Sequence, residues 1–110
     1  MFRSIYHNCS LAVLIYDITS KESFNHLGKF LWELKIEKNS SDLRIFLIGN
    51  KIDLENERKI SIDEGNIFKE RNNLSLFLET SAKTGINIKN IFEQAAEILC
   101  KDYMSYKLNN

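Results

Sequence analysis

The sequence predicts an α/β fold in which helices cover both faces of a parallel sheet, giving three layers. Three apolar runs alternate along the chain with three amphipathic stretches, and this order is typical of parallel strands joined by right-handed crossovers. The 110 residues contain no proline and only four glycines, so few residues interrupt regular structure. A chain of this length suits one domain, over residues 1–110.

The first strand is expected over residues 11–16, which are apolar on both faces, as a buried parallel strand requires. A helix over residues 23–37 follows, with Thr19 or Ser20 as its N-terminal cap. The apolar residues of this helix recur at steps of three and four and form one face: Phe24, Leu27, Leu31 and Leu34.

The second strand is expected over residues 44–48, and a polar loop follows it over residues 50–59. Ser61 and Glu64 have the spacing of a capping box, in which each side chain accepts a hydrogen bond from the other residue's backbone. This box predicts the start of a short helix over residues 61–71.

The third strand is expected over residues 75–79, and a long helix begins near Asn87. The apolar stripe of this helix again follows steps of three and four: Ile88, Ile91, Phe92, Ala95, Leu99 and Tyr103. Since ligands of parallel sheets bind at the carboxyl ends of the strands, the residues after each strand are the candidates for function.

Residues 17–19 follow the first strand and begin with Asp17. A carboxylate in this place can be a metal ligand, but a turn residue is the expected role. His7 and His26 have no cysteine or carboxylate at the spacing of a metal site, so structural roles are expected for both.

Residues 50–53, Asn-Lys-Ile-Asp, follow the second strand. The carboxylate of Asp53 can accept two parallel hydrogen bonds from a planar edge, which guanine offers through N1–H and its exocyclic amine and adenine does not. The wrong base would leave the carboxylate unpaired, so discrimination would be strong. The stem of Lys51 can cover a base while its ammonium group stays in water. A helix cap or a solvated loop is the competing interpretation.

Residues 79–83, Glu-Thr-Ser-Ala-Lys, follow the third strand. Their small side chains let a backbone N–H approach a ligand carbonyl closely. Alone, this segment reads as a turn near a helix cap. Together with residues 50–53 it is more specific, because both segments follow strands of one parallel sheet on neighbouring loops.

The charge balance excludes several classes of protein. The 15 basic and 15 acidic residues give a formal charge of +0, which argues against a nucleic-acid platform or a polybasic membrane anchor. No apolar run approaches the roughly 20 residues of a membrane-spanning helix.

The two cysteines, Cys9 and Cys100, are too few for a disulfide framework and favour a reduced, cytoplasmic setting.

The chain resembles a Ras-superfamily small GTPase, and most of all the Rab family, over residues 4–103. The matching segments are 16–19 (Tyr-Asp-Ile-Thr), 23–24 (Ser-Phe), 49–54 (Gly-Asn-Lys-Ile-Asp-Leu) and 79–83. Residues 41–54 and 58–61 are also similar to the Golgi-associated Rab subgroup. The resemblance implies the C-terminal, guanine-binding part of a Ras-like P-loop GTPase fold, truncated at its N-terminus.

The resemblance implies a role for each residue of the first motif. Asp53 would bind the N1 and amine edge of guanine, and Ser81 would support its carboxylate. Asn50 would bind near N7 and tie the loops together, and Lys51 would pack on the base.

In the second motif, the backbone N–H of Ala82 would donate to the guanine O6, and Lys83 would cover the other side of the base. The family further implies GTP or GDP as ligand, Rab effectors and regulators as partners, and vesicle-mediated protein transport as function. It also implies a place on the cytosolic face of Golgi or vesicle membranes.

Several family features have no match in the sequence. No Gly-x-x-x-x-Gly-Lys-Ser/Thr phosphate loop occurs, and no Asp-x-x-Gly-Gln precedes residues 2–4. The switch threonine, the catalytic glutamine, the Mg²⁺ ligands and the prenylated C-terminal cysteines also lack counterparts. We therefore expect no useful GTP hydrolysis from this chain. The alternative function is a truncated pseudo-GTPase or a non-enzymatic interaction module.

The order of strands in the family also predicts an exposed edge of the sheet. The strand over residues 11–16 would normally pair with the absent first strand, so here it would form an apolar sheet edge without charge or proline. Such edges invite pairing with another chain. We therefore expect the chain alone to be marginally stable or to self-associate through this edge.

Overall fold

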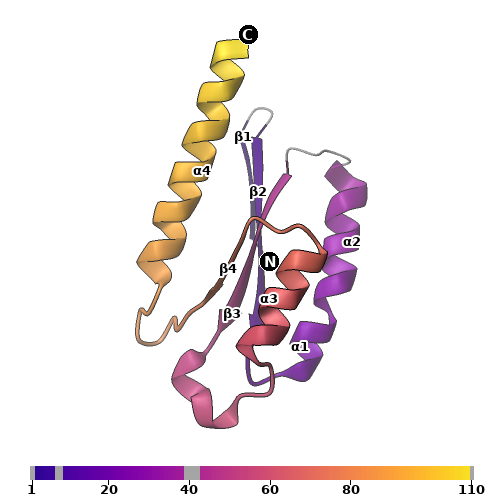
Figure 1. Cartoon of the computed structure of the whole chain (residues 1–110), viewed down its shortest axis with the longest axis vertical. Coiled ribbons are helices and arrows are strands. Elements are labelled where there is room, and N and C mark those ends of the chain that lie inside the picture. The colour runs from indigo at the N-terminus through magenta and orange to yellow at the C-terminus, as the bar shows by residue number, and fades with distance from the viewer. Residues whose placement is uncertain (1, 7–8, 39–42, 110) are drawn as a thin grey trace.

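The structure, a computed structural model, describes the backbone of residues 2–6, 9–38 and 43–109, and the side chains of residues 11–36 and 43–101. A central sheet is flanked by helices on both sides (Figure 1). The α/β fold class expected from the sequence is confirmed.

The sheet has four strands in the order β1-β2-β3-β4. Strands β2, β3 and β4 run parallel, as expected, whereas β1 pairs antiparallel with β2. The strands are β1 (Phe2–Tyr6), β2 (Cys9–Asp17), β3 (Leu43–Asn50) and β4 (Leu76–Glu79). The sheet is therefore mixed rather than wholly parallel.

Strand β1 was not expected from the sequence, and it corrects the prediction of an open edge at residues 11–16. It pairs with β2 from Cys9 to Val13, while no described strand pairs with residues 14–17 on that side. Only two residues separate β1 from β2 along the chain, so closing the connection requires little loss of chain entropy. The pairing gives backbone donors and acceptors of β2 partners that the prediction had left exposed.

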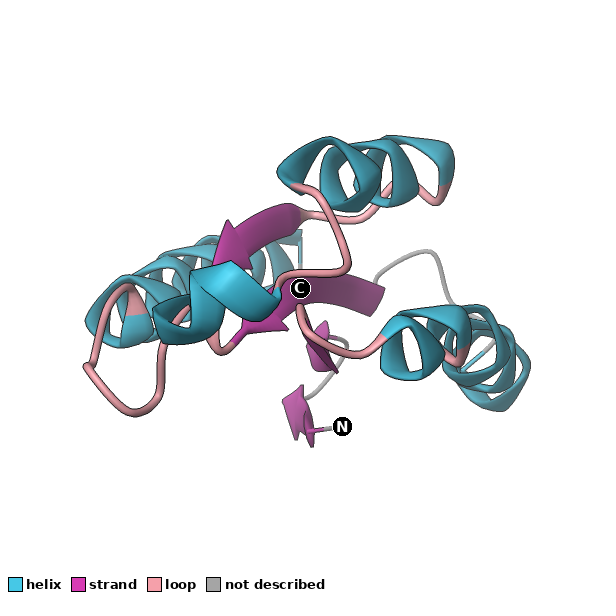
Figure 2. Ribbon diagram, turned by 90° about the horizontal axis from the view of Figure 1, so that it is seen from below, coloured by secondary structure: helices cyan, strands magenta, loops and turns pink. Residues whose placement is uncertain are grey.

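The helices are α1 (Lys21–Asn25), α2 (Leu27–Lys38), the 3-10 helix η1 (Ile52–Glu57), α3 (Ile62–Arg71) and α4 (Ile88–Asn109). Viewed end-on, α4 lies on one side of the strands and α1, α2 and α3 lie on the other (Figure 2). Within the described residues, no helix is both long enough and apolar enough to cross a lipid bilayer.

Two helix boundaries differ from the expectation. The helix expected over residues 23–37 is divided at His26 into α1 and α2, and Ser20 caps α1 by accepting a hydrogen bond from the Ser23 N–H. The loop expected over residues 50–59 contains η1. The capping box of Ser61 and Glu64 is present at the start of α3.

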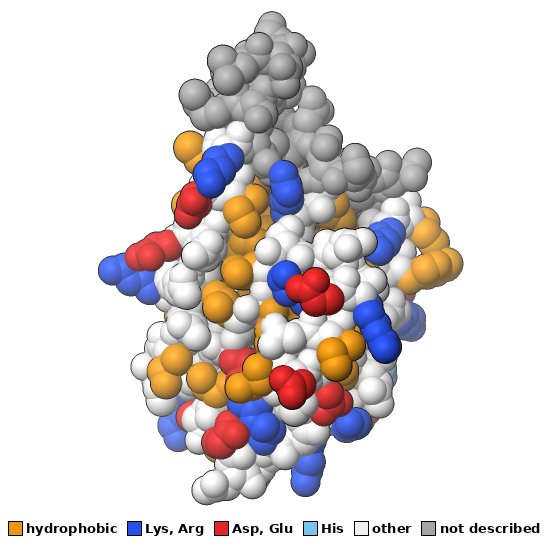
Figure 3. Space-filling model, viewed as in Figure 1, with side chains coloured by type: hydrophobic (Ala, Val, Ile, Leu, Met, Phe, Trp, Pro, Cys, Tyr) orange, Lys and Arg blue, Asp and Glu red, His pale blue; other side chains and the backbone are white. Residues whose placement is uncertain are grey.

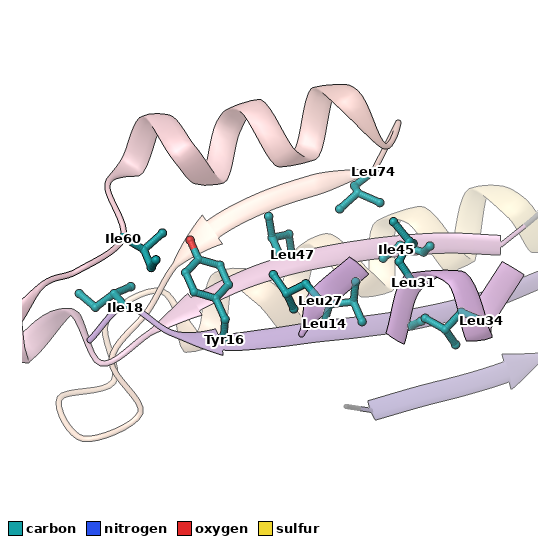
Figure 4. Packing of buried hydrophobic residues seen from close by; sticks show 11 residues of the cluster. Leu14, Tyr16, Ile18, Leu27, Leu31, Leu34, Ile45, Leu47, Ile60 and Leu74 are labelled. Carbon is teal, nitrogen blue, oxygen red and sulfur yellow. The ribbon is translucent and has the colours of Figure 1, made fainter. Parts of the chain in front are cut away.

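The larger core cluster lies between the sheet and α1, α2 and α3 (Figure 4). Leu27, Leu31 and Leu34 are buried there, and Phe24 is half-buried against them, so the expected apolar face is confirmed. The residues of the strands alternate between the two faces, because successive side chains of a strand point to opposite sides. Leu14 therefore joins this cluster while Val13 joins the other.

The smaller cluster lies under α4. Ile91, Ala95 and Leu99 of the expected stripe pack against it, and Ile98, which the stripe did not include, does so too. Phe92 is 70% exposed, so the expected stripe is not buried at this position. The side chain of Tyr103 lies outside the described residues.

Candidate functional site

The candidate residues gather where β2, β3 and β4 end, because the three parallel strands finish at the same edge of the sheet. Asp17 is aligned with Asn50 across β2 and β3, and Gly49 with Glu79 across β3 and β4. Beyond the strands, backbone bonds continue between the loops: the Thr80 N–H donates to the Gly49 carbonyl at 2.7 Å. The loops after β3 and β4 are thus held side by side.

The Asn50 side chain joins these two loops. Its Oδ1 accepts hydrogen bonds from Thr80 Oγ1 at 3.0 Å and from the Ala82 N–H at 3.2 Å. Thr80 is buried, so its hydroxyl hydrogen bond is shielded from competition with water. Asn50 is therefore fixed in orientation, with its amide NH₂ as its remaining donor group.

The Asp53 carboxylate is held from behind. Ser81 Oγ donates to Asp53 Oδ1 at 2.7 Å, and the Thr84 N–H donates to Ser81 Oγ at 3.0 Å. Ser81 is fully buried and lies behind the carboxylate rather than beside a ligand. A carboxylate held in this way is pre-organised to accept hydrogen bonds in one plane.

Lys51 forms an ion pair at the edge of the site. Its Nζ lies 2.8 Å from Asp17 Oδ2. Partial burial raises the pKa of Asp17, but hydrogen bonds from Lys51 and Thr19 outweigh this effect and hold that pKa below its ordinary value. The same hydrogen bond to Asp17 raises the pKa of Lys51. Both groups are therefore charged near neutral pH.

A pocket of about 360 Å³ opens between these loops. It is lined by Asn50, Lys51, Asp53, Leu54, Ala82 and Lys83. Five of the six expected site residues thus surround one space, and Ser81 supports it from behind. The lining offers a carboxylate, an amide and the apolar parts of two lysine side chains, a set that suits a planar ring with hydrogen-bond donors on its edge.

One expected role meets a competing contact. The Ala82 N–H, expected to donate to a guanine carbonyl, already donates to Asn50 in this structure. The bond must be shared or lengthened before the same N–H reaches a ligand. The expected roles of all six residues toward a base remain predictions.

Two contributors were not assigned a role at the site by the sequence interpretation. Thr80 belongs to the second motif without an expected role of its own, yet its hydroxyl donates directly to the Asn50 side chain. Asp17 was expected to act in a turn, and it does accept bonds from the Thr19 N–H and Oγ1, but it also pairs with Lys51. Their positions directly after strands were the available signal.

A partly buried ion pair, called here the brace, supports the loop after β4. Arg58 makes a two-pronged contact with Glu79, with Nη1–Oε2 at 2.7 Å and Nη2–Oε1 at 2.8 Å. Hydrogen bonds to Glu79 and then Glu55 raise the pKa of Arg58, so the guanidinium stays charged. Because Glu79 is the last residue of β4, this brace fixes the point from which residues 80–83 start.

The Mg²⁺ that the family uses has no evident place in the described part of the chain. No three His, Cys, Asp or Glu side chains converge there in a way that could hold a metal ion. Asp17, the residue considered as a metal ligand, instead pairs with an ammonium group. Within the described residues, no side-chain cluster therefore forms a metal site made of protein ligands alone.

Comparison with known proteins places the chain beside one protein family and its members. The model of the Ras family matches residues 1–101. The Ras-related protein Rab-2B of Dictyostelium discoideum is 40% identical over 99 residues, which cover 90% of this chain and 48% of that protein. The chain thus spans about half the length of this curated relative.

Proposed function

The chain belongs to the Ras family and is a Rab-like member of the small GTPases, and from this premise we propose that it recognises guanine nucleotides through the pocket between residues 50–54 and 80–83. The base would lie in the pocket with its N1–H and exocyclic amine facing Asp53. Asn50 would meet the N7 side, and Lys51 and Lys83 would lie against the two faces of the ring.

The observation that carries the proposal is the fixed Asp53 carboxylate. Ser81 holds Oδ1 at 2.7 Å, so the carboxylate presents a defined plane to the pocket. A guanine edge has two donors that match two carboxylate oxygens, whereas adenine has an acceptor at N1. The mismatch leaves a carboxylate oxygen without a donor, which costs about 1–3 kcal/mol.

Titration of the full chain with GDP and with ADP tests the proposal. GDP is expected to bind at least about tenfold more tightly than ADP, by the same energy of an unpaired acceptor. Equal affinity for the two nucleotides, or no binding of GDP at millimolar concentration, would contradict it.

The variant Asp53→Asn sharpens this test. An amide in place of the carboxylate loses one acceptor and gains a donor, so GDP binding should fall by about tenfold to a hundredfold. Xanthosine diphosphate carries a carbonyl where guanine has its amine, so its affinity should rise. The control Asp63→Asn removes the same charge from an exposed position of α3 and should change neither affinity.

The wider role follows from the family. We propose that the whole protein is a Rab that regulates vesicle-mediated transport, with GTP or GDP and Mg²⁺ as its ligands, effectors and regulators as its partners, and Golgi or vesicle membranes as its place of action. The similarity to a Rab over 90% of the chain supports this proposal. Because the chain spans 48% of that relative, hydrolysis belongs to the same proposal rather than to the described residues.

The alternative of a non-enzymatic interaction module has less support. It does not explain why Ser81 donates a hydrogen bond to Asp53, or why Asn50 accepts hydrogen bonds from two groups of the neighbouring loop. Self-association through β2 also stays a proposal, limited to residues 14–17, because β1 pairs with the preceding residues. Sizing of the full chain over a range of concentrations tests it.

A further inference from the structure

We propose that Asp17 is a positioning residue of the guanine site, acting through Lys51. In this proposal, which rests on the proposed function, the carboxylate at the end of β2 holds the lysine ammonium so that the lysine stem stays stretched along the pocket wall. The base then meets a wall that is already in place, rather than a mobile side chain.

The Asp17 side chain is itself fixed. Its Oδ1 accepts hydrogen bonds from the Thr19 N–H at 2.8 Å and from Thr19 Oγ1 at 2.6 Å. The Asp17 N–H donates to Ser23 Oγ at 3.0 Å. These contacts leave Oδ2 as the oxygen that meets Lys51 Nζ at 2.8 Å. Lys51 therefore pairs with a carboxylate whose orientation is fixed by the hydrogen bonds of the surrounding turn.

The Lys51 side chain needs such a partner to stay in place. Its backbone has a φ of 73°, the left-handed region, at the turn between β3 and η1. The side chain is 52% exposed, and an unanchored lysine samples many rotamers. The ion pair joins the turn after β3 to the end of β2 and gives the stem a defined path beside the pocket that Lys51 lines.

The ion pair is not needed to hold the two strands together. The register of β2 and β3 already aligns Asp17 with Asn50, and the Ile18 N–H donates to the Asn50 carbonyl at 3.1 Å. Ion pairs with an exposed partner contribute little to stability. The ion pair instead fixes the orientation of the Lys51 side chain.

The environment of Asp17 also differs from that of other lysine partners. The carboxylates that pair with Lys89 and Lys101 on α4 are 63% and 59% exposed, whereas Asp17 is 23% exposed. A less exposed carboxylate with two further hydrogen bonds forms the more persistent pair. This difference makes Glu97, the partner of Lys101, a suitable control.

The variant Asp17→Asn tests the proposal in the full chain. Asparagine keeps an oxygen for the two Thr19 contacts but removes the negative charge that meets Lys51. GDP affinity should fall by about threefold to fivefold, the range of a partly exposed ion pair, with unfolding unchanged. Glu97→Gln should leave GDP affinity unchanged.

The double variant Asp17→Asn/Lys51→Met separates positioning from a general structural effect. Methionine keeps an apolar stem but has no ammonium, so Asp17→Asn should have no further effect on GDP affinity in the Lys51→Met background. The same loss in both backgrounds would overturn the proposal, because Asp17 would then act independently of Lys51.

A measurement without nucleotide completes the test. The Lys51 ammonium group should give a protected NMR signal in the ligand-free chain, and Asp17→Asn should remove it. A Lys51 ammonium as mobile as that of Lys101 would overturn the proposal. Equal GDP affinity of Asp17→Asn and the unchanged chain would overturn this inference alone, whereas absence of any GDP binding would overturn the proposed function and this inference with it.

Discussion

The two faces of the sheet are covered to very different extents. Among the residues whose side chains the structure describes, the face under α1, α2 and α3 carries a cluster of eleven buried residues, whereas the face under α4 carries four. Both faces draw on the same strands, whose alternate residues are apolar on both sides. The difference therefore comes from the number of helices that pack on each face, and not from the composition of the strands.

The face under α4 also retains a groove of about 350 Å³. Its lining includes Ile15 and Phe92, which are 50% and 70% exposed. On the side of the molecule seen in Figure 3, hydrophobic side chains form a band between α4 and the helices of the other face. Asn50 and Ala82 line both this groove and the pocket between residues 50–54 and 80–83, so the open face adjoins the candidate site.

The largest expected effect is the loss of a side chain from the well-covered face. Leu47 is fully buried in the eleven-residue cluster, so Leu47→Ala should lower the free energy of unfolding by about 2–5 kcal/mol. Phe92→Ala on the open face should change it by no more than about 0.5 kcal/mol. Urea unfolding measures both, and similar losses would show that the two faces are equally packed.

The second effect concerns charges on the two faces. Glu79→Gln weakens the two-pronged contact with Arg58, whose side chains are 13% and 16% exposed, and should lower the free energy of unfolding by about 2–3 kcal/mol. Glu93→Gln, which removes an exposed partner of Lys89 on α4, should have little measurable effect. Thermal melting compares the two variants. A Glu79→Gln variant as stable as the unchanged chain would contradict a stabilising role of the Arg58–Glu79 contact.

The smallest effect comes from adding one methyl group. In Gly65→Ala the new Cβ on α3 would collide with the Phe77 ring of β4, so overpacking should lower the free energy of unfolding by about 1–3 kcal/mol. The control Gly28→Ala on α2 meets no neighbouring atom and should raise it by about 0.5–1 kcal/mol. If both variants were stabilised, α3 would pack less closely on the sheet than the structure shows.

Much of the fold could be predicted from local patterns. The run at residues 11–16, the steps from Leu27 to Leu34 and the capping box at Ser61 each depend on residues close together in the chain. Boundaries were less accurate, as the break at His26 illustrates, because one amphipathic face continues across two helices. Phe92 shows the other limit: periodicity identifies an apolar position but does not say whether another element covers it.

For the candidate site, the residue pattern was sufficient to predict which residues lie at the ends of the strands. Asn50, Asp53 and Ser81 follow strands of one parallel sheet, and the geometry of such a sheet brings those ends to one edge. Which atoms meet there depends on how the loops fold. The contacts of Ser81 with Asp53 and of Asp17 with Lys51 depend on loop conformation and on fractions of an ångström, which no pattern of residue types encodes.

Strand β1 likewise could not be predicted from the residue pattern. Its residues gave no strand pattern that the sequence interpretation recognised, and its place was decided by the unpaired backbone of β2 beside it. Backbone hydrogen bonds do not depend on side-chain identity, so an edge strand is selected by what is free to pair with it. Apolar periodicity, by contrast, is a property of the side chains. The sequence was therefore sufficient to predict the parallel strands of the core, but not the strand that pairs at their edge.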